Sequence, residues 1–460
     1  MEQFEINDTI AAVSTPAGVG GIAVIRVSGP KAIQTVNEAW NGARLTEVKS
    51  HTAHLGEYRA KDGEILDQCV ATVFKGPNSF TGQDVVEISV HGSGWIQREL
   101  LNDLVKRGVR IANPGEFTQR AFANGKFDLT QAEGVADLIA SSSRAAHSLA
   151  LSQTKGSFSK EFLQLRNNLI EFASLLELEL DFSEEEVEFA ERKALIELCE
   201  RIIGKIDRLA GSYSNGAALK NGVPVVIAGI PNAGKSSLLN LLLGEDKAIV
   251  TDIPGTTRDI IEDAVEINGV LYRFMDTAGL RSTHDLVEGI GVDRAQAAIR
   301  KAHIVIWVID STAPIEPQLT NIGKESQEIS QNTIVLLNKA DVTGNVEEIL
   351  SPEKYNPATI LFSTKTRRGE KELLERLHHL ATKGQNPESD IIITNARHFE
   401  ALTRASESLK RALEGLQNGL SGDFIAQDIR EATAHLSALT GDITTTHLFH
   451  SIFSRFCIGK

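Results

Sequence analysis

Residues 229–237 read GIPNAGKSS, and this stretch decides the fold of the middle of the chain. It fits the P-loop pattern GxxxxGK[ST] from Gly229 to Ser236. It follows the apolar run VPVVIAGI and opens the helical pattern KSSLLNLLLG, which is the strand–loop–helix context that the motif requires. Glycines let backbone N–H groups close around phosphate, and the start of the next helix favours an anion. The stretch therefore predicts a nucleoside triphosphate site in a parallel α/β domain.

Two further motifs follow in the order that a phosphate and metal site needs. Lys235 is expected to reach the β- and γ-phosphates, and the Ser236 hydroxyl to bind Mg²⁺. In TDIPGTTRD, Thr257 is placed to complete the Mg²⁺ shell and to sense the γ-phosphate. FMDTAGL is a β run that ends in DxxG, with Asp276 near the metal and Gly279 able to donate its N–H to the γ-phosphate.

The base-binding signal lies in IVLLNKAD, a buried strand that ends in the NKxD pattern. Asp341 is expected to accept the N1–H and the exocyclic amine of guanine, donors that adenine lacks. LFSTK, ending at Lys365, is a loose version of the last base-binding loop. Each motif alone could be an ordinary turn, but four in order predict a domain that binds and hydrolyses GTP. The residues expected to contact the nucleotide are Asn232, Ala233, Gly234, Lys235, Ser236, Ser237, Thr251, Asp252, Ile253, Pro254, Gly255, Thr256, Thr257, Asp276, Thr277, Ala278, Gly279, Asn338, Lys339, Asp341, Ser363, Thr364 and Lys365.

One position departs from the common GTPase pattern. Leu280 follows DxxG where Ras-type enzymes place a Gln that orients the attacking water, and Leu280 cannot do this. Arg281 is close by, but a solvated surface Arg is its simpler interpretation. Hydrolysis still needs positive charge between the phosphates. Asn232 either offers its side-chain oxygen to a monovalent cation such as K⁺ or only stabilises the turn. Further oxygen ligands for such a cage would come from Thr251, Ile253 and Gly255 or Thr256.

Composition and charge limit the protein class. The 460 residues suffice for two to four domains, and a net charge of −14 means that RNA contact would need a local basic patch or a basic partner. The first ten residues resemble neither a signal nor a transit peptide, and no apolar run reaches the roughly 20 residues of a membrane span. Cys69, Cys199 and Cys457 lack metal-site spacing, which favours a reducing, cytoplasmic location.

The pattern along the chain changes three times. Residues 1–120 mix short β runs with helices and predict an α+β domain, whereas residues 121–217 show long helical patterns without proline. Strands and helices alternate over residues 218–380, as in a parallel α/β sheet. Residues 381–460 are helical again. Since each helical half needs a partner for its apolar stripe, we expect one discontinuous helical domain with a Ras-like P-loop GTPase domain inserted; three consecutive domains are the alternative.

Several stretches together resemble one family. GIPNAGKSSLLNLLL, TDIPGTTRD, DTAGLR, the stretch PGEFTQRAFANGKFDLTQAEGVADLI and the terminal CIGK are similar to the MnmE (TrmE) family, GTPases that modify the wobble uridine of certain tRNAs. The similarity covers essentially the whole chain. It implies an N-terminal tetrahydrofolate-binding domain that dimerises, a helical domain built from two segments, and a G domain between them.

The resemblance also implies roles for particular residues. K⁺ is expected at Asn232, Thr251, Ile253 and Thr256, where it drives G-domain pairing, and Glu288 is expected to position the water. A folate derivative, 5-formyl- or 5,10-methylene-tetrahydrofolate, would be held by Arg26, Glu87, Lys126 and Lys460. Cys457 would lie near the one-carbon unit as a nucleophile or a shield, or it only closes the last helix. Cys69 and Cys199 are expected in the core.

The resemblance further implies a partner, MnmG (GidA), which brings FAD and NADH. Together they would add a carboxymethylaminomethyl group to C5 of the wobble uridine (U34), with GTP hydrolysis driving domain motion. Two alternatives stay open: a ribosome-assembly GTPase, and a folate-dependent one-carbon enzyme with a regulatory G domain. Analysis of the wobble uridine in a deletion strain separates the three.

Overall fold

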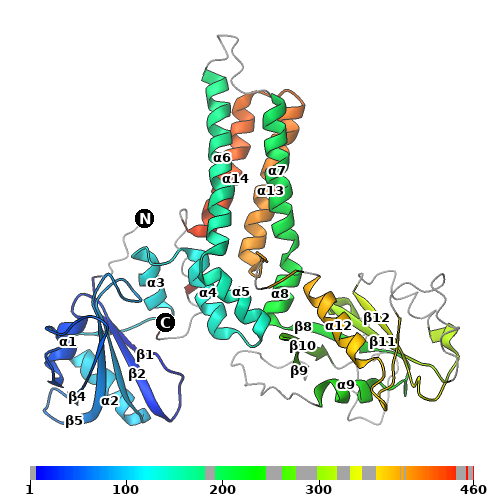
Figure 1. The fold of residues 1–460 in the computed structure, drawn as a ribbon. Helices are drawn as coiled ribbons and strands as arrows, with labels where there is room; N and C mark the ends of the chain where they lie inside the picture. Colours follow the sequence, from blue (N-terminus) through cyan, green and yellow to red (C-terminus); the bar gives the residue numbers. More distant parts are fainter. Residues whose placement is uncertain are drawn as a thin grey trace, which may run out of the picture. The chain divides into compact units, whose positions relative to one another are not determined.

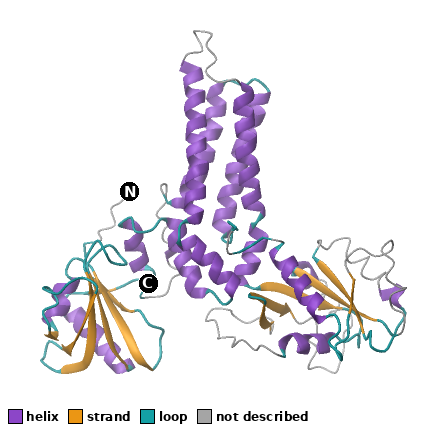
Figure 2. Cartoon of the chain, viewed as in Figure 1, coloured by secondary structure: helices purple, strands orange, loops and turns teal. Residues whose placement is uncertain are grey.

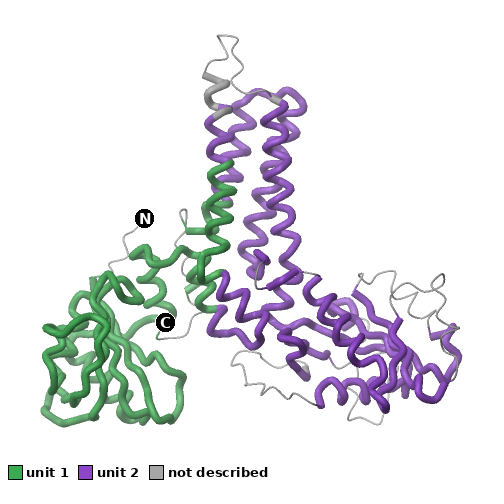
Figure 3. The backbone as a smooth tube through the Cα atoms, viewed as in Figure 1, with its two compact units in different colours: residues 1–136, 153–168, 436–460 green, residues 137–152, 169–435 purple. Residues whose placement is uncertain are grey.

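The chain folds into two compact units, each built from separate chain segments (Figure 3). The computed structural model describes residues 7–181, 192–244, 262–275, 298–318, 332–343, 359–383, 385–387, 390–441, 452–453 and 459. Unit 1 comprises residues 1–136, 153–168 and 436–460, and unit 2 comprises residues 137–152 and 169–435. Strands occur in one sheet of each unit among the described residues (Figure 2).

Unit 1 contains a seven-stranded sheet in the order β3-β4-β5-β6-β2-β1-β7 (Figure 1). All neighbouring strands are antiparallel except β1 and β7. The strands are β1 (Ile10–Val13), β2 (Gly20–Ser28), β3 (Trp40–Gly42), β4 (Thr52–Arg59), β5 (Ile65–Phe74), β6 (Val85–Gly92) and β7 (Arg110–Ile111). Helices α1 (Ala32–Glu38) and α2 (Gly94–Lys106) share one apolar cluster with the sheet.

Unit 1 also holds α3 (Glu116–Ala123), the start of α4 (Leu129–Ala140) and described residues from the end of the chain. Ile452 and Phe453 are buried in a cluster with Leu129. The rings of Phe122 and Phe453 lie 6.5 Å apart. Ile452 and Phe453 therefore belong to the core of unit 1 beside α3 and α4.

Unit 2 contains a six-stranded sheet in the order β13-β12-β11-β8-β10-β9, parallel except for the β9–β10 hairpin. The strands are β8 (Val223–Ala228), β9 (Glu262–Ile267), β10 (Val270–Met275), β11 (Ile304–Asp310), β12 (Thr333–Asn338) and β13 (Thr359–Leu361). Every residue of β11 and β12 is buried, as expected for strands of a parallel sheet covered on both faces. The helices of this α/β part that lie wholly within the described residues are α9 (Lys235–Leu243) and α12 (Glu370–Thr382).

Helices from both sides of the α/β part pack together in unit 2. Cys199 Sγ on α7 (Arg192–Gly211) lies 3.5 Å from Leu409 O on α13 (Ala396–Gln417). Asp207 on α7 accepts a 2.5 Å hydrogen bond from Ser406 on α13. Among the described residues, the other helices are α5 (Arg144–Thr154), α6 (Ser157–Asp181), α8 (Tyr213–Asn221) and α14 (Gly422–Thr440), of which only α8 lies wholly in unit 2. The prediction of a discontinuous helical part with an inserted α/β part is therefore confirmed.

The short β runs and helices predicted within residues 1–120 are confirmed, for example by β5, β6 and α2. Cys69 and Cys199 are buried as predicted. The proposed domain boundaries at 120, 217 and 380 stay predictions. Among the described residues, we find no helix with both the length and the apolar character to cross a membrane.

Candidate functional site

The P-loop connects β8 to α9 through backbone conformations that favour glycine. Gly229 has φ 142° and Gly234 has φ 102°, and Asn232 also adopts a positive φ of 61°. A Cβ on Gly229 would lie 2.2 Å from Val308 O on β11. The pattern of glycines is therefore required by the close approach of the loop to the sheet.

Lys235 is folded back onto its own loop. Its Nζ donates to Gly229 O and Ile230 O, each at 2.8 Å. Burial lowers the pKa of Lys235. The oxygens of a phosphate group are charged and therefore stronger acceptors than these two carbonyls. Lys235 can thus exchange its hydrogen bonds to the carbonyls for hydrogen bonds to the phosphates of a nucleotide. The hydroxyl-bearing Ser236 and Ser237 follow it on α9 and are exposed.

The base-binding segments are joined to the P-loop through one buried amide. Asn338, 1% exposed, ends β12. Its Nδ2 donates to Ala233 O at 2.8 Å, and its Oδ1 accepts from Thr364 N at 3.2 Å. A Cβ on Gly234 would lie only 2.1 Å from Asn338 Nδ2. Asn338 thus holds the P-loop and the loop after β13 in a fixed relation.

The carboxylate predicted to read guanine is held by the second base loop. Asp341 Oδ1 accepts a 2.7 Å hydrogen bond from Ser363 Oγ, and Ser363 is fully buried. This hydrogen bond is the main cause that lowers the pKa of Asp341. Asp341 is exposed, and its own backbone N–H also donates to the carboxylate. An ionised and accessible carboxylate suits the two donors of a guanine edge.

Lys339, next in the NKxD motif, pairs with a neighbouring strand. Its Nζ lies 2.6 Å from Asp310 Oδ2 at the end of β11. Burial raises the pKa of Asp310, but the hydrogen bonds from Lys339 and Thr312 outweigh it and lower that pKa overall. This pair fixes the end of β11 beside the NKxD motif.

The structure describes only part of the predicted nucleotide site. The described members are Asn232, Ala233, Gly234, Lys235, Ser236, Ser237, Asn338, Lys339, Asp341, Ser363, Thr364 and Lys365. Its members outside the described residues are Thr251, Asp252, Ile253, Pro254, Gly255, Thr256, Thr257, Asp276, Thr277, Ala278, Gly279 and Glu288; Cys457 and Lys460 of the predicted folate site also lie outside them. The P-loop and both base segments thus meet at the carboxyl ends of β8, β12 and β13.

The second candidate site lies in unit 1, where Arg26 on β2 faces Glu87 on β6. Arg26 Nε and Nη2 donate to Glu87 Oε1 at 2.9 and 2.8 Å. The two side chains are 18% and 28% exposed, so both remain accessible. Glu87 Oε2 and Arg26 Nη1 have no partner among the described residues. The pair therefore presents one free acceptor and one free donor group.

Two aromatic rings hold the Arg26 guanidinium. Its Cζ lies 5.1 Å from the Phe80 ring centroid and 5.6 Å from that of Phe117. The third predicted folate residue, Lys126, is exposed and donates from Nζ to Pro77 O at 3.1 Å. These side chains come from separate parts of the sequence and gather around β2 and β6.

The end of the chain reaches the strand next to Arg26. Ser14 Oγ donates to Gly459 O at 3.1 Å, and a Cβ on Gly459 would lie 2.1 Å from Val13 O. Gly459 has φ 98°, so only glycine suits this contact. Val13 pairs with Ile25 on β2, next to Arg26.

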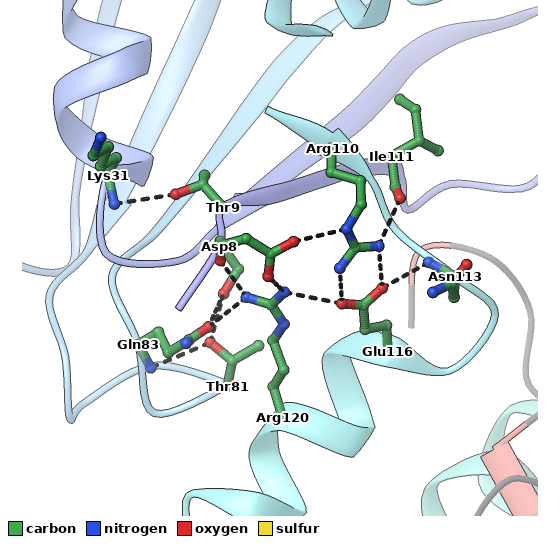
Figure 4. A network of polar contacts seen from close by, with 11 residues as sticks. Asp8, Thr9, Lys31, Thr81, Gln83, Arg110, Ile111, Asn113, Glu116 and Arg120 are labelled. Atoms are coloured by element: carbon green, nitrogen blue, oxygen red, sulfur yellow. Dashed lines mark hydrogen bonds and ion pairs between the residues drawn. The ribbon is translucent and has the colours of Figure 1, made fainter. Parts of the chain in front are cut away.

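Sequence reasoning missed a network of charged residues beside this site (Figure 4). Asp8 lies between Arg110 and Arg120, and both arginines also bind Glu116. The i,i+4 spacing of Glu116 and Arg120 was the available signal, because residues so spaced lie on one face of a helix. The positions of Asp8 and Arg110 carried no such signal.

Comparisons with known proteins agree on one family. Residues 9–126 match the family model described as the GTP-binding protein TrmE N-terminus, and residues 129–457 match the MnmE helical domain. A tRNA modification GTPase MnmE of Parabacteroides distasonis is 49% identical over 98% of this chain and 100% of its own length. The protein of the same name from Cytophaga hutchinsonii is 47% identical over 99% and 98% of the two chains.

Among solved structures, the G domain of the T. maritima FeoB iron transporter is 27% identical, with a TM-score of 0.28. The aligned region covers 35% of this chain and 98% of the FeoB chain. The family is established by the two relatives above, because their similarity extends over 98–99% of this chain and so includes both units. The chain therefore belongs to the MnmE family of tRNA modification GTPases.

Proposed function

We propose that this chain is a K⁺-dependent GTPase that acts with MnmG to add a carboxymethylaminomethyl group to C5 of the wobble uridine of certain tRNAs. A tetrahydrofolate derivative bound in unit 1 supplies the one-carbon unit, and FAD and NADH act only through the partner. The observation that carries the proposal is the contact of Gly459 with Ser14. It brings Gly459, in the terminal CIGK motif, to Ser14 and Val13, and Val13 pairs with Ile25 next to Arg26.

The chemistry of the Arg26–Glu87 pair supports a pterin ligand. The amino-pyrimidinone edge of a pterin carries neighbouring N–H donors and a carbonyl acceptor. Since neither atom has a partner in the part of the chain that the structure describes, Glu87 Oε2 can accept from those donors and Arg26 Nη1 can donate. The Phe80 ring beside Arg26 adds a flat apolar surface. Lys126, exposed and with two further N–H groups, suits the anionic glutamate tail of a folate.

The P-loop supports the metal assignments. Ser236 is exposed at the start of α9, where its hydroxyl would bind Mg²⁺ together with Thr257. Asn232 is also exposed, and no hydrogen bond engages its side chain within the described residues. Its amide oxygen is free for K⁺, which would supply positive charge in place of an arginine finger. Thr251, Ile253 and Thr256 are the other proposed K⁺ ligands, and Glu288 the residue that positions water.

Exposed apolar residues in unit 1 support the proposed homodimer. Val19, between β1 and β2, and Ile22 on β2 are 92% and 69% exposed. Leu55 on β4 is 67% exposed. Dimerisation of unit 1 would cover these side chains.

The cation dependence tests the nucleotide part of the proposal. We expect GTP turnover to rise when K⁺ replaces Na⁺ at equal ionic strength, and Asn232→Ala to abolish the difference. Asn240→Ala, which removes an exposed amide from α9, is the matched control and keeps the K⁺ response. Equal turnover of the unmodified chain in both salts would refute K⁺ dependence.

Modification of tRNA tests the remaining part. Mass spectrometry of wobble uridine from a reconstituted reaction with MnmG should show the carboxymethylaminomethyl group. Cys457→Ser should keep GTP hydrolysis and lose the modification, since this thiol is proposed to lie near the one-carbon unit. Modification that persists in Cys457→Ser would assign the thiol to packing, and modification without added folate would refute the folate role.

A further inference from the structure

The loop between β5 and β6 (residues 75–84) is tied to α3 and the residues after it by three side chains. Asn124 Nδ2 donates to Thr81 O at 2.7 Å, and Lys126 Nζ donates to Pro77 O at 3.1 Å. Arg120 Nη1 donates to Gln83 Oε1 at 3.2 Å. The three donors lie within seven residues of sequence, so a single structural element fixes the course of the whole loop.

This β5–β6 loop carries Phe80 to the candidate pterin site. Phe80 stands 5.1 Å from Arg26 Cζ and 5.6 Å from the Phe127 ring. Thr81, directly after it, is fully buried and shares a 2.8 Å hydroxyl hydrogen bond with Ser28, the last residue of β2. The position of the loop therefore decides whether Phe80 covers Arg26.

The anchor on α3 is itself rigidly held. The Arg120 side chain is 3% exposed, and its Nη1 and Nη2 donate to Asp8 O at 2.7 Å and Asp8 Oδ1 at 2.5 Å (Figure 4). Glu116 accepts a further 2.9 Å hydrogen bond from Arg120 Nη2. A buried guanidinium with this many partners keeps one geometry, because any displacement would leave charge without a partner.

We propose that Asn124 and Arg120 are positioning residues of the pterin site: they fasten the β5–β6 loop to α3 and so hold Phe80 over Arg26. Neither is assigned to the ligand itself, and the inference rests on the proposed folate binding. Their effect is exerted through Thr81 and Gln83 on Phe80. Loss of a tether then weakens binding because the free loop must be ordered when the ligand binds.

The test measures binding of 5-formyltetrahydrofolate to the full chain by calorimetry. We expect Asn124→Ala, which changes an exposed side chain, to raise the Kd roughly 3- to 10-fold, the value of one tethering hydrogen bond. Gln83→Ala removes the acceptor that Arg120 has on the loop without deleting the buried cation, and it should have a similar effect. Asn41→Ala is the control, since Asn41 is exposed and donates a 2.8 Å hydrogen bond to Glu57 at the far edge of the sheet.

A double-mutant cycle separates positioning from general destabilisation. If Asn124 acts through Phe80, Asn124→Ala adds almost nothing to the Kd of Phe80→Ala. Hydrogen exchange without ligand should also quicken at residues 78–83 in Asn124→Ala, while the thermal midpoint stays within about one degree of that of Asn41→Ala.

The outcomes distinguish the two proposals. Unchanged Kd and unchanged exchange in Asn124→Ala overturn the positioning role, even where Arg26→Ala abolishes binding. Additive effects in the cycle overturn the route through Phe80. If Arg26→Ala and Glu87→Ala bind 5-formyltetrahydrofolate as tightly as the unmodified chain, the proposed folate site fails instead, whatever the exchange data show.

Discussion

Glu116 shows at the scale of single residues how a buried carboxylate contributes to stability in unit 1. It accepts hydrogen bonds from Arg110, Arg120 and the backbone N of Asn113. Burial is the largest influence and raises the pKa of Glu116, but these donors together outweigh it and bring that pKa below its ordinary value of 4.5. The folded state therefore binds this proton more weakly than the unfolded chain, and Glu116 stabilises the fold when ionised.

The sign of this shift sets the expected pH dependence. The contribution of Glu116 is complete above about pH 4.5 and is lost as the pH falls through its lower folded-state pKa. We expect Glu116→Gln to lower the free energy of unfolding at pH 7 by about 3 kcal/mol and to flatten the loss of stability below pH 4.5. Glu47→Gln is the control, because Glu47 forms an exposed pair with Arg44. It should change the free energy of unfolding at pH 7 by less than about 1 kcal/mol. Urea unfolding between pH 3 and 7 measures both; equal curves for the two variants would contradict the role of Glu116.

The cysteines allow a second test at this scale. Cys69 is 3% exposed and Cys199 is fully buried, and burial is the main cause that raises the pKa of each thiol to about 12. The thiolate is the reactive form, so neither should react with iodoacetamide in the native protein at pH 8. Peptide mass spectrometry should find both labelled only after unfolding in urea. Native labelling of Cys199 at the rate of a free thiol would mean that α7 separates from α13.

At the scale of elements, the junction of the P-loop and α9 depends on a glycine. Gly234 has φ 102°, and a Cβ there would lie 2.1 Å from the Asn338 amide nitrogen. Gly234→Ala should therefore displace Asn338 from Ala233 and raise the Kd for GTP at least about 100-fold, or about 2.7 kcal/mol. Gly204→Ala, in open space on α7, is the matched control and should be neutral or stabilise the fold by about 0.5–1 kcal/mol. Equal GTP binding by both variants, measured by fluorescence titration, would contradict the structural role of Gly234.

The elements also show what the sequence could and could not predict. Local patterns predicted short β runs within residues 1–120, such as β6, and helices within residues 381–460, such as α13, because periodicity and propensity agree there. The P-loop was predictable because its glycines, lysine and hydroxyl must occur at fixed spacing. The link from Asn338 to Ala233 was not, since it joins residues 105 positions apart. The same holds for Gly459 against Val13, which depends on how the chain end packs in three dimensions.

At the scale of the whole molecule, a helical segment that precedes the P-loop by some eighty residues belongs to the core of the α/β part. Ala145 N on α5 donates to Gly269 O, at the turn between β9 and β10, at 2.8 Å. Leu149, one turn further along α5, is 2% exposed and packs in the cluster that contains Val270 and Tyr272. The β9–β10 hairpin is thus supported from outside the inserted segment, and β10 leads directly to the predicted DxxG motif at residues 276–279.

This contact predicts that α5 stabilises the sheet that carries the nucleotide motifs. Leu149→Ala should lower the free energy of unfolding of unit 2 by about 2–4 kcal/mol, because the cavity lies between α5 and β10. The effect should appear as faster hydrogen exchange at residues 270–275, although the substitution lies outside the α/β part. Leu420→Ala, the same change at a side chain 51% exposed, is the control and should leave that exchange unchanged. Equal exchange at β10 in the two variants would mean that the sheet of unit 2 does not depend on α5 for its stability.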